Sequence, residues 1–192
     1  PIKENSLLSG ALEPTNEWYA IAKITGIKLI QAYRKQYGYD WISAMPTNLY
    51  GYGDNFHPEN SHVVPALLRK FHEAKFQNLS EIELWGTGNP KREFLHVDDL
   101  AEALIFLMNN YDSKSTINVG TGEDVSIKEL ANNMQKLIGF NGAIHWNEGM
   151  PDGTPRKLLN VSKINNLGWK SRIELTKGIE QTYRWYTEKI GN

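Results

Sequence analysis

The sequence contains no cysteine among its 192 residues. A disulfide framework, a thiolate zinc site and a cysteine nucleophile are therefore excluded within this chain. Neither charge sign dominates, because 21 Lys and Arg residues stand against 22 Asp and Glu residues, for a net charge of −1. This balance argues against a protein that binds nucleic acid nonspecifically, since such a protein needs a basic excess.

Long apolar runs are also missing, and no stretch approaches the roughly 18 residues that suggest a membrane span. The first residues, 1–5, show no basic segment followed by an apolar one, so no signal peptide is visible. An initiator methionine is absent as well. These features predict a cytoplasmic protein that binds no membrane and no nucleic acid, in a chain that is processed or truncated.

Helix-like and strand-like patterns alternate along the chain, which is typical of an α/β fold. A long helix is predicted over 17–37, with Thr15 or Asn16 as its N-cap and an apolar stripe through Gly26 and Leu29. A buried strand over 41–45 is expected to end at Pro46, which cannot donate to a ladder. Further helices are expected at 64–75, 98–109 and 177–189, a capping box at Ser126 and Glu129, and strands at 83–85, 93–97, 116–119 and 143–146. No strong linker is visible, so one compact body is favoured.

The sharpest local motif is Tyr19-Ala20-Ile21-Ala22-Lys23. Residues four apart lie on one face of a helix, so the ammonium of Lys23 can favour the phenolate form of Tyr19. Such a tyrosine can exchange a proton with a carbonyl or alcohol oxygen during hydride transfer. On spacing alone, a surface tyrosine beside a solvated lysine is the better interpretation.

The surrounding motifs reverse that preference. They are the stretches 12–16, 45–51, 54–58, 60–63, 92–99 and 151–157, which read LEPTN, MPTNLYG, DNFHP, NSHV, REFLHVDD and PDGTPRK. With these motifs the chain resembles the extended short-chain dehydrogenase/reductase superfamily, in the branch that acts on nucleotide sugars. Within that branch it is similar to the GDP-L-fucose synthase family, from about residue 12 to 185.

The resemblance implies catalytic roles for three residues. Tyr19 would donate the proton for ketone reduction, and Lys23 would bind the nicotinamide ribose of NADP(H) and tune Tyr19. His62 would be the acid of two epimerisations and would also touch the cofactor. In the family this histidine works opposite a cysteine, which would lie upstream of Pro1. An ordinary surface histidine is the alternative for His62.

The resemblance also assigns binding residues. The segment Pro46, Thr47, Asn48 and Leu49 would contact the nicotinamide end of the cofactor, although a simple turn remains possible for Thr47. The contacts to a GDP-sugar would come from Asn48, Lys70, Trp85, Arg92, Asp152 and Lys157. Core packing is nearly as good an interpretation of Trp85, and a solvated loop is the alternative for the basic pair Arg156 and Lys157.

No metal site is expected. His57 and His62 lie five residues apart, but there is no third ligand at a plausible spacing. A structural role is favoured for His57. His96 lies in an apolar strand before a helix that Asp98 is expected to cap, and it is interpreted as a core histidine whose hydrogen bonds are satisfied.

A Gly-rich dinucleotide fingerprint is absent. Gly51-Tyr52-Gly53 leads into a loop, and Gly120-Thr121-Gly122 lacks the third glycine. The resemblance places the fingerprint upstream, so the chain is expected to be the C-terminal part of such an enzyme, inactive alone and unable to bind NADPH. Residues 1–60 would be the remainder of the Rossmann-like NADP-binding domain. Residues 61–192 would be mainly a smaller α/β substrate domain, with segments returning to the Rossmann-type parallel sheet.

The activity implied by the resemblance is epimerisation at C3 and C5 of GDP-4-keto-6-deoxy-D-mannose, followed by NADPH-dependent reduction at C4. Two alternatives stay open: another nucleotide-sugar 4-epimerase or 4,6-dehydratase, and a non-catalytic module that binds sugar nucleotides. The resemblance further implies a homodimer through the helix over 17–37.

Overall fold

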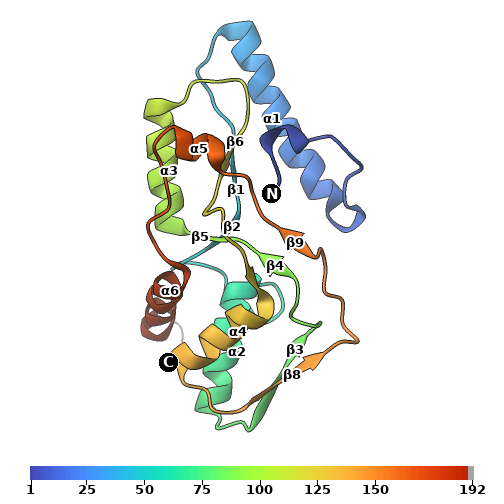
Figure 1. Cartoon of the computed structure of the whole chain (residues 1–192), viewed down its shortest axis with the longest axis vertical. Helices are drawn as coiled ribbons and strands as arrows, with labels where there is room; N and C mark the ends of the chain where they lie inside the picture. Colours follow the sequence, from blue (N-terminus) through green and yellow to red (C-terminus); the bar gives the residue numbers. More distant parts are fainter. Residues whose placement is uncertain (190–192) are drawn as a thin grey trace.

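Two bodies stacked along the long axis make up the computed structural model, which describes residues 1–189 (Figure 1). Residues 190–192, the end of the second expected domain, lie outside the described residues. The upper body in Figure 1 holds α1 (Glu17–Tyr37), β1 (Ala44–Pro46), α3 (Val97–Asn110), β6 (Ile117–Val119) and α5 (Ser162–Asn166). The lower body holds α2 (Val63–Phe76), β3 (Glu81–Trp85), α4 (Ile127–Ile138), β8 (Ala143–Asn147) and α6 (Leu175–Lys189).

Short elements occupy the middle and the N-terminal segment. They are β2 (Asn48–Tyr50), β4 (Lys91–Arg92), β5 (Phe94–His96), β7 (Val125–Ser126) and β9 (Arg156–Lys157), with 3₁₀ turns at Glu4–Ser6 and Pro14–Asn16. The strands pair in parallel as β1 with β6, β2 with β5 and β3 with β8. β4 lies between antiparallel β7 and parallel β9. Parallel pairs joined by helices confirm the predicted α/β fold class.

The apolar core is divided between the two bodies. The lower core packs α2 against α4 and α6, with Leu68, Phe71 and Met134 fully buried. The upper core packs α3 and α5 against β5 and β6, with Leu107 and Ile164 fully buried. Each such side chain contributes about 1.5–3 kcal/mol when it leaves water. Packing therefore places two semi-separate cores in the chain, where the sequence favoured a single compact body.

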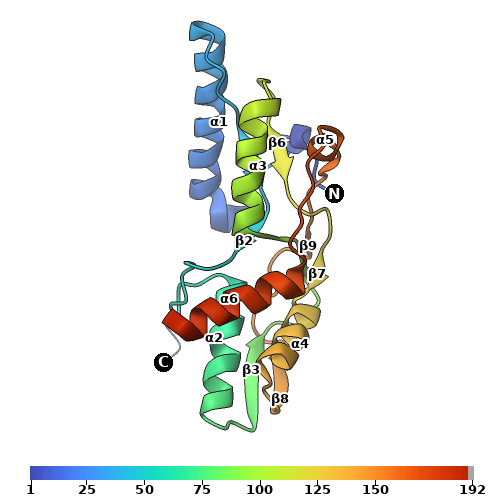
Figure 2. The ribbon, with the colours of Figure 1, turned by 90° about the vertical axis from the view of Figure 1, so that its left-hand side faces the viewer.

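Helix α1 projects at the top of the upper body (Figure 2), and β1 and β6 lie between it and α3 (Figure 1). None of its residues is buried, and Trp18 and Leu29 are 79% and 53% exposed. No atom of the described residues lies within 4 Å of the position that a Cβ on Gly26 would occupy. The apolar stripe predicted here is present, but within residues 1–189 nothing packs against its outer face. None of the described residues makes the close backbone packing expected at Gly26.

Strand β1 is shorter than predicted and includes Pro46. Thr47 N–H donates to the Val119 carbonyl at 3.0 Å, and Pro46 is in register with Val119. Alternate residues of a strand face the partner, so the missing N–H of Pro46 points to the opposite edge of β1. The structure places no strand of residues 1–189 at that edge, which is why a proline is tolerated there.

Several boundaries differ from the predictions for local reasons. Helix α3 begins at Val97 and its N-cap is His96, whose side chain accepts from the Asp98 N–H, so Asp98 is not the cap. Asn16 occupies the N-cap of α1 without a side-chain bond. The capping box of Ser126 and Glu129 is confirmed in full.

No helix in the described part of the chain has the length and apolarity to cross a bilayer.

His96 is 1% exposed, which confirms a core histidine, but only one ring nitrogen is satisfied. Nδ1 accepts from Asp98 N–H at 3.2 Å, whereas Nε2 has no hydrogen-bond partner among residues 1–189. Burial lowers the pKa of this imidazole, and the nearby carboxylates of Asp98 and Asp99 only partly oppose that effect. Charging His96 is therefore harder in the folded state than in the unfolded state.

We expect His96 to make the fold less stable in acid. A lowered folded-state pKa means that the unfolded chain binds the extra proton first, so stability falls as the pH drops through the ordinary histidine range, about 6.5. His96→Asn keeps a hydrogen-bond acceptor at the N-cap, an amide oxygen in place of Nδ1, and removes the titrating ring. Melting temperatures between pH 7.5 and 5 should fall less in the variant than in the wild type. Equal pH slopes for the two proteins would contradict this role.

Candidate active site

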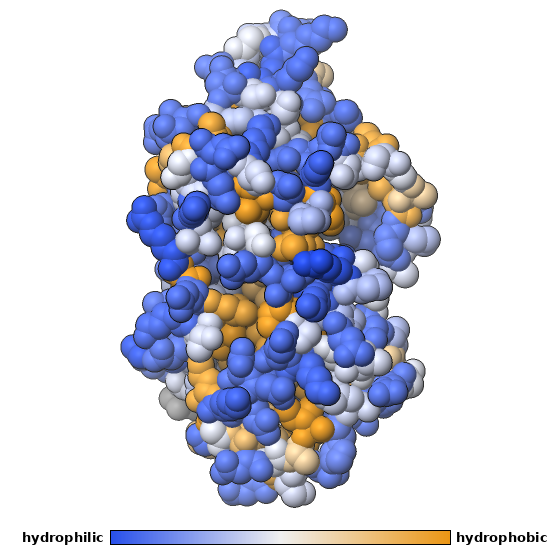
Figure 3. All heavy atoms as spheres, in the orientation of Figure 1, coloured by the Kyte–Doolittle hydropathy of each residue, from blue (hydrophilic) through white to orange (hydrophobic). Residues whose placement is uncertain are grey.

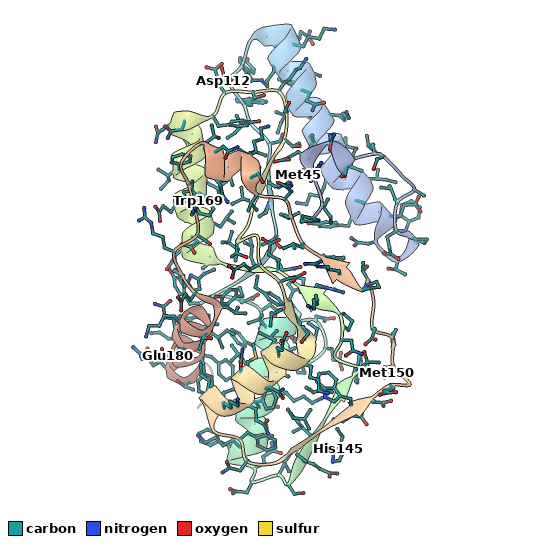
Figure 4. The ribbon with its side chains drawn as sticks, in the orientation of Figure 1. Met45, Asp112, His145, Met150, Trp169 and Glu180 are labelled. Carbon is teal, nitrogen blue, oxygen red and sulfur yellow. The ribbon has the colours of Figure 1, made fainter. Side chains whose placement is uncertain are left out.

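A cleft of about 910 Å³ opens between the first half of α1 and the segment 44–54. It is also lined by Ile2, Leu7, His62, Val97, Lys157 and Leu159. In Figure 4 the labelled Met45 of β1 lies beside α1, where the cleft begins. The cleft brings together eight residues predicted from sequence: Tyr19, Lys23, Pro46, Thr47, Asn48, Leu49, His62 and Lys157.

Tyr19 and Lys23 lie one turn apart on α1. The Lys23 Nζ atom lies 5.4 Å from the centroid of the Tyr19 ring, within the range of a cation–π contact. Tyr19 is 60% exposed and makes no hydrogen bond to the rest of the described chain, so its hydroxyl faces the cleft unengaged. The predicted helical pair is therefore formed, and a substrate oxygen can reach it.

The segment 46–49 leaves the carboxyl end of β1, where parallel sheets bind their ligands. The side chains of Thr47 and Asn48 are both anchored to the Glu93 carbonyl, through Oγ1 at 3.2 Å and Nδ2 at 2.8 Å. The backbone of Glu93, between β4 and β5, thus holds the side chains of Thr47 and Asn48 in place at the cleft.

His62 occupies the N-cap position of α2 but makes no capping bond with its side chain. Its ring is exposed and lines the cleft, so it is available to a ligand. His57 lies outside the cleft lining, and its Nδ1 accepts from the Glu59 N–H at 3.2 Å, in line with a structural role. No group of three metal-ligating side chains that could hold an ion occurs within residues 1–189.

Lys157 lines the cleft and lies close to two arginines, Arg92 and Arg156. It lies in β9 in register with Arg92 of β4, so the two side chains are neighbours on the sheet. Burial lowers the pKa of Arg92, and no carboxylate within the described residues pairs with it. Arg156, in contrast, is held by Asp124 through Nε and through a 3.3 Å bond from its second nitrogen. Lys157 is thus the better placed of the basic pair to bind a ligand.

Lys70, Trp85 and Asp152 lie away from the cleft, around the end of β3. Trp85 is 65% exposed, so it is not part of the strand core. Lys70 Nζ donates to the Glu83 carbonyl at 2.6 Å. Asp152, just after the labelled Met150 in Figure 4, accepts 2.7 Å bonds from the N–H and the hydroxyl of Thr87. This carboxylate holds two loops together.

Arg92 lies between the residues of the cleft and the loop that contains Asp152. An Arg92 guanidinium nitrogen lies 3.6 Å from where a Cβ on Gly153 would sit, so it reaches the loop that contains Asp152. Polar side chains therefore run from Tyr19 and Lys157 in the cleft to Arg92 and the loop that contains Asp152. Figure 3 shows apolar surface between the upper and lower bodies. Arg92 also lines a smaller hollow of about 320 Å³, together with Phe94, Thr121 and Leu175.

The described residues fit one end of a dinucleotide and not the other. Tyr19, Lys23 and the segment 46–49 suit a nicotinamide ribose, which needs hydroxyl, cationic and backbone partners. The turn Gly120–Gly122 is unsuited to a pyrophosphate, because Gly122 N–H already donates to the Glu93 carboxylate at 2.8 Å. A phosphate beside that carboxylate would be repelled.

Sequence reasoning missed three residues of the cleft region. Tyr52 and Asp54 line the cleft, and the Tyr52 hydroxyl donates to Asp98, which raises the pKa of Tyr52. Glu93 is fully buried beneath it. The available signal in the sequence was a glutamate between Arg92 and the apolar residues Phe94 and Leu95. The hydrogen-bond partners of Glu93 come from distant segments, so the sequence pattern did not identify them.

Comparison with known proteins gives consistent results. Residues 1–120 match the NAD dependent epimerase/dehydratase family. A probable GDP-L-fucose synthase 1 of Oryza sativa subsp. japonica is 62% identical over 190 residues, which are 99% of this chain and 58% of that protein. The GDP-L-fucose synthase of Escherichia coli K12 is 54% identical over 197 residues, covering 98% of this chain and 61% of that protein.

Solved structures of related enzymes are similar to this chain in fold. A GDP-L-fucose synthetase of Naegleria fowleri bound to NADP superposes with a TM-score of 0.92 at 30% identity, over 98% of this chain and 61% of that one. A UDP-glucose 4-epimerase of Thermotoga maritima gives 0.82 at 21% identity, with 99% and 58% covered, which shows the shared fold alone. The chain spans about three fifths of the length of these relatives.

Proposed function

The chain belongs to the NAD dependent epimerase/dehydratase family, and from that membership and its cleft we propose that it forms the catalytic and sugar-nucleotide site of a GDP-L-fucose synthase. The substrate would be GDP-4-keto-6-deoxy-D-mannose and the cofactor NADP(H). The observation that carries the proposal is the gathering of Tyr19, Lys23, His62 and Lys157 around one cleft. The likeness to the rice and Escherichia coli synthases supports it.

Tyr19 is the proton donor for reduction at C4. Its hydroxyl, on the exposed ring that the Lys23 ammonium approaches, gives a proton to the ketone oxygen as that oxygen gains negative charge. Lys23 also binds the nicotinamide ribose, and the segment 46–49 borders the nicotinamide ring. When bound, NADPH supplies the hydride. The carbonyl thus becomes a secondary alcohol with one hydride on carbon and one proton on oxygen.

His62 exchanges protons at carbon. Hydrogens on the carbons next to a ketone are acidic enough to be removed by a base and returned on the other face by an acid. A neutral imidazole accepts a proton and an imidazolium returns one near neutral pH. With its ring free of capping bonds and exposed to the cleft, His62 serves C3 and C5.

The GDP moiety follows the path from Lys157 to Trp85. Lys157 and the unpaired Arg92 contact the pyrophosphate, because both are cations on neighbouring strands. Trp85 offers an exposed ring on which guanine stacks, with Lys70 next to it. Asn48 contacts the sugar from the cleft floor, and Asp152 acts by holding the loop that faces Arg92.

The division of the chain into two bodies supports a proposed assignment of two domains. Residues 1–60 supply α1 and β1 of an NADP-binding Rossmann-like domain, and α3 and β6 return to it from later in the chain. The rest of 61–189 forms mainly the sugar-nucleotide domain around β3 and β8.

The substrate half of the proposal is tested by GDP binding to the 192-residue chain, measured by calorimetry. Trp85→Ala should weaken binding by about 5- to 100-fold, the usual range for loss of a base-stacking ring. Tyr39→Ala, which removes an exposed ring beyond the end of α1, is the matched control and should leave the affinity unchanged. Equal binding of GDP by W85A and wild type would contradict the placement of guanine on Trp85.

Activity is best tested in a hybrid in which this chain replaces the 190 matching residues of the rice relative. The hybrid should convert GDP-4-keto-6-deoxy-D-mannose to GDP-L-fucose and oxidise one NADPH per product. A 4-epimerase would leave the hydrogens at C3 and C5 unexchanged, and a 4,6-dehydratase, which breaks the C5–H bond, would leave the hydrogen at C3 unexchanged. A hybrid that binds GDP but does no chemistry would favour a non-catalytic sugar-nucleotide module.

The open face of α1 suggests how two copies associate. Trp18, Ile21 and Leu29 are exposed on this helix, and no described atom approaches Gly26. We propose that the corresponding helix of a second copy covers this stripe. Leu29→Lys should raise the dimer dissociation constant more than about tenfold, because it removes a buried leucine from each copy. Sedimentation equilibrium measures this, with Lys28→Gln as control; a monomeric wild type would contradict the proposal.

A further inference from the structure

Glu93 is a buried carboxylate with an unusual set of partners. It lies between β4 and β5 and is 0% exposed. Glutamate is almost never fully buried unless it is paired, and no cation pairs with it anywhere in residues 1–189. Within the described residues, its side-chain oxygens contact only uncharged hydrogen-bond donors.

The carboxylate oxygens bind two distant segments. Oε1 accepts from Gly122 N–H at 2.8 Å and more weakly from the Thr121 hydroxyl at 3.4 Å. Oε2 accepts from Leu159 N–H at 2.8 Å. The fit is close, because a Cβ on Gly120 would lie 2.2 Å from Oε1. A side chain at position 120 would therefore displace the carboxylate.

The backbone of Glu93 binds a third segment. Its carbonyl accepts from Asn48 Nδ2 at 2.8 Å and from the Thr47 hydroxyl at 3.2 Å. One residue thus joins the ends of β1, β6 and β9 to the start of β5. These segments are 28 to 66 residues away from Glu93 in the sequence.

Two of the joined segments, and the segment of Glu93 itself, each place a residue of the proposed site. Asn48 is bound directly, Arg92 is the preceding residue, and Lys157 lies two residues before Leu159. We infer that Glu93 is a positioning residue, which fixes Asn48, Arg92 and Lys157 relative to one another so that they engage one sugar nucleotide. This inference rests on the proposed function for the identity of the ligand.

Glu93→Gln tests the inference with little change of volume. One side-chain oxygen becomes an NH₂ group, which cannot accept a bond, so either Gly122 or Leu159 loses its acceptor. An unpaired buried N–H is costly, and the strand ends should move apart to relieve it. GDP affinity of the 192-residue chain should fall about tenfold, at a temperature well below the melting point of the variant.

Asp99→Asn is the matched control. Asp99 is also buried, at 2% exposure, and its carboxylate accepts from two backbone donors, Arg172 N–H at 3.1 Å and Ile173 N–H at 2.9 Å. None of these partners belongs to the proposed site. Both bonds go to the same oxygen, Oδ2, so the carbonyl oxygen of an asparagine can accept both in its place. E93Q should lose GDP affinity, whereas the affinity of D99N should stay within twofold of the wild type.

Amide hydrogen exchange gives a readout that needs no ligand. In E93Q the amide of Gly122 or of Leu159 should exchange faster than in the wild type, while in D99N the exchange of both should be unchanged. Equal losses of GDP affinity in both variants, or unchanged exchange at Gly122 and Leu159 in E93Q, would overturn the inference. If the wild type itself binds no GDP, the proposed substrate site fails, and the exchange data alone decide whether Glu93 positions these segments.

Discussion

Replacing Tyr19 with phenylalanine should lower the rate of C4 reduction by the hybrid about 10²- to 10⁴-fold, the usual contribution of a positioned proton donor. The variant removes one oxygen atom. Because Tyr19 is 60% exposed and its hydroxyl makes no bond to the described chain, the fold should be unaffected. The measurement is NADPH oxidation at saturating substrate, together with the melting temperature.

The control for Tyr19→Phe is Tyr37→Phe, which changes an exposed tyrosine at the other end of the same helix. It should leave the rate unchanged. Exchange of the C3 and C5 hydrogens with solvent should continue in Y19F, because that chemistry is assigned to His62. A Y19F rate within threefold of the wild type would remove Tyr19 from the proton-donor role.

Replacing His62 with alanine should impair proton exchange at C3 and C5, the step that Tyr19→Phe leaves intact. Solvent exchange at C3 and C5 should fall about 10²- to 10⁴-fold, since a general acid–base group is lost. Binding of NADPH to the hybrid should change far less. The exposed ring and the absence of a capping bond predict only a small change in stability. Exchange is followed by proton NMR of the keto-sugar in D₂O.

His57→Ala is the matched control for the histidine. His57 belongs to the same loop, is exposed, and accepts a local bond from Glu59. His57→Ala should loosen the loop by removing this hydrogen bond, but exchange of the C3 and C5 hydrogens should stay within a few-fold of the wild-type rate. Equal effects of H57A and H62A would mean that loop order, and not a proton carried by His62, limits the epimerisation.

Local patterns predicted those features that depend on neighbouring residues. The helical spacing of Tyr19 and Lys23 fixes their contact on α1, and the capping box of Ser126 and Glu129 starts α4 where expected. Both depend on interactions three or four residues apart. The placement of His62 beside Tyr19 came from the resemblance, because no local pattern joins two segments 43 residues apart.

Features that depend on distant contacts could not be read from the pattern. Asp152 binds Thr87 across 65 residues, and Glu93 binds Leu159 across 66. Whether the apolar stripe of α1 is covered depends on what lies against the helix, which amphipathic spacing does not specify. Pro46 is accommodated in β1 only because its edge faces no other described strand, a fact of topology.

The central claim is that one cleft carries both proton exchange at carbon and reduction of the ketone. It is tested most directly by incubating the hybrid with GDP-4-keto-6-deoxy-D-mannose and NADPH in D₂O, and analysing the product by NMR and mass spectrometry. The proposal predicts GDP-L-fucose with deuterium at both C3 and C5. A reduced product that carries no deuterium at either carbon would contradict it.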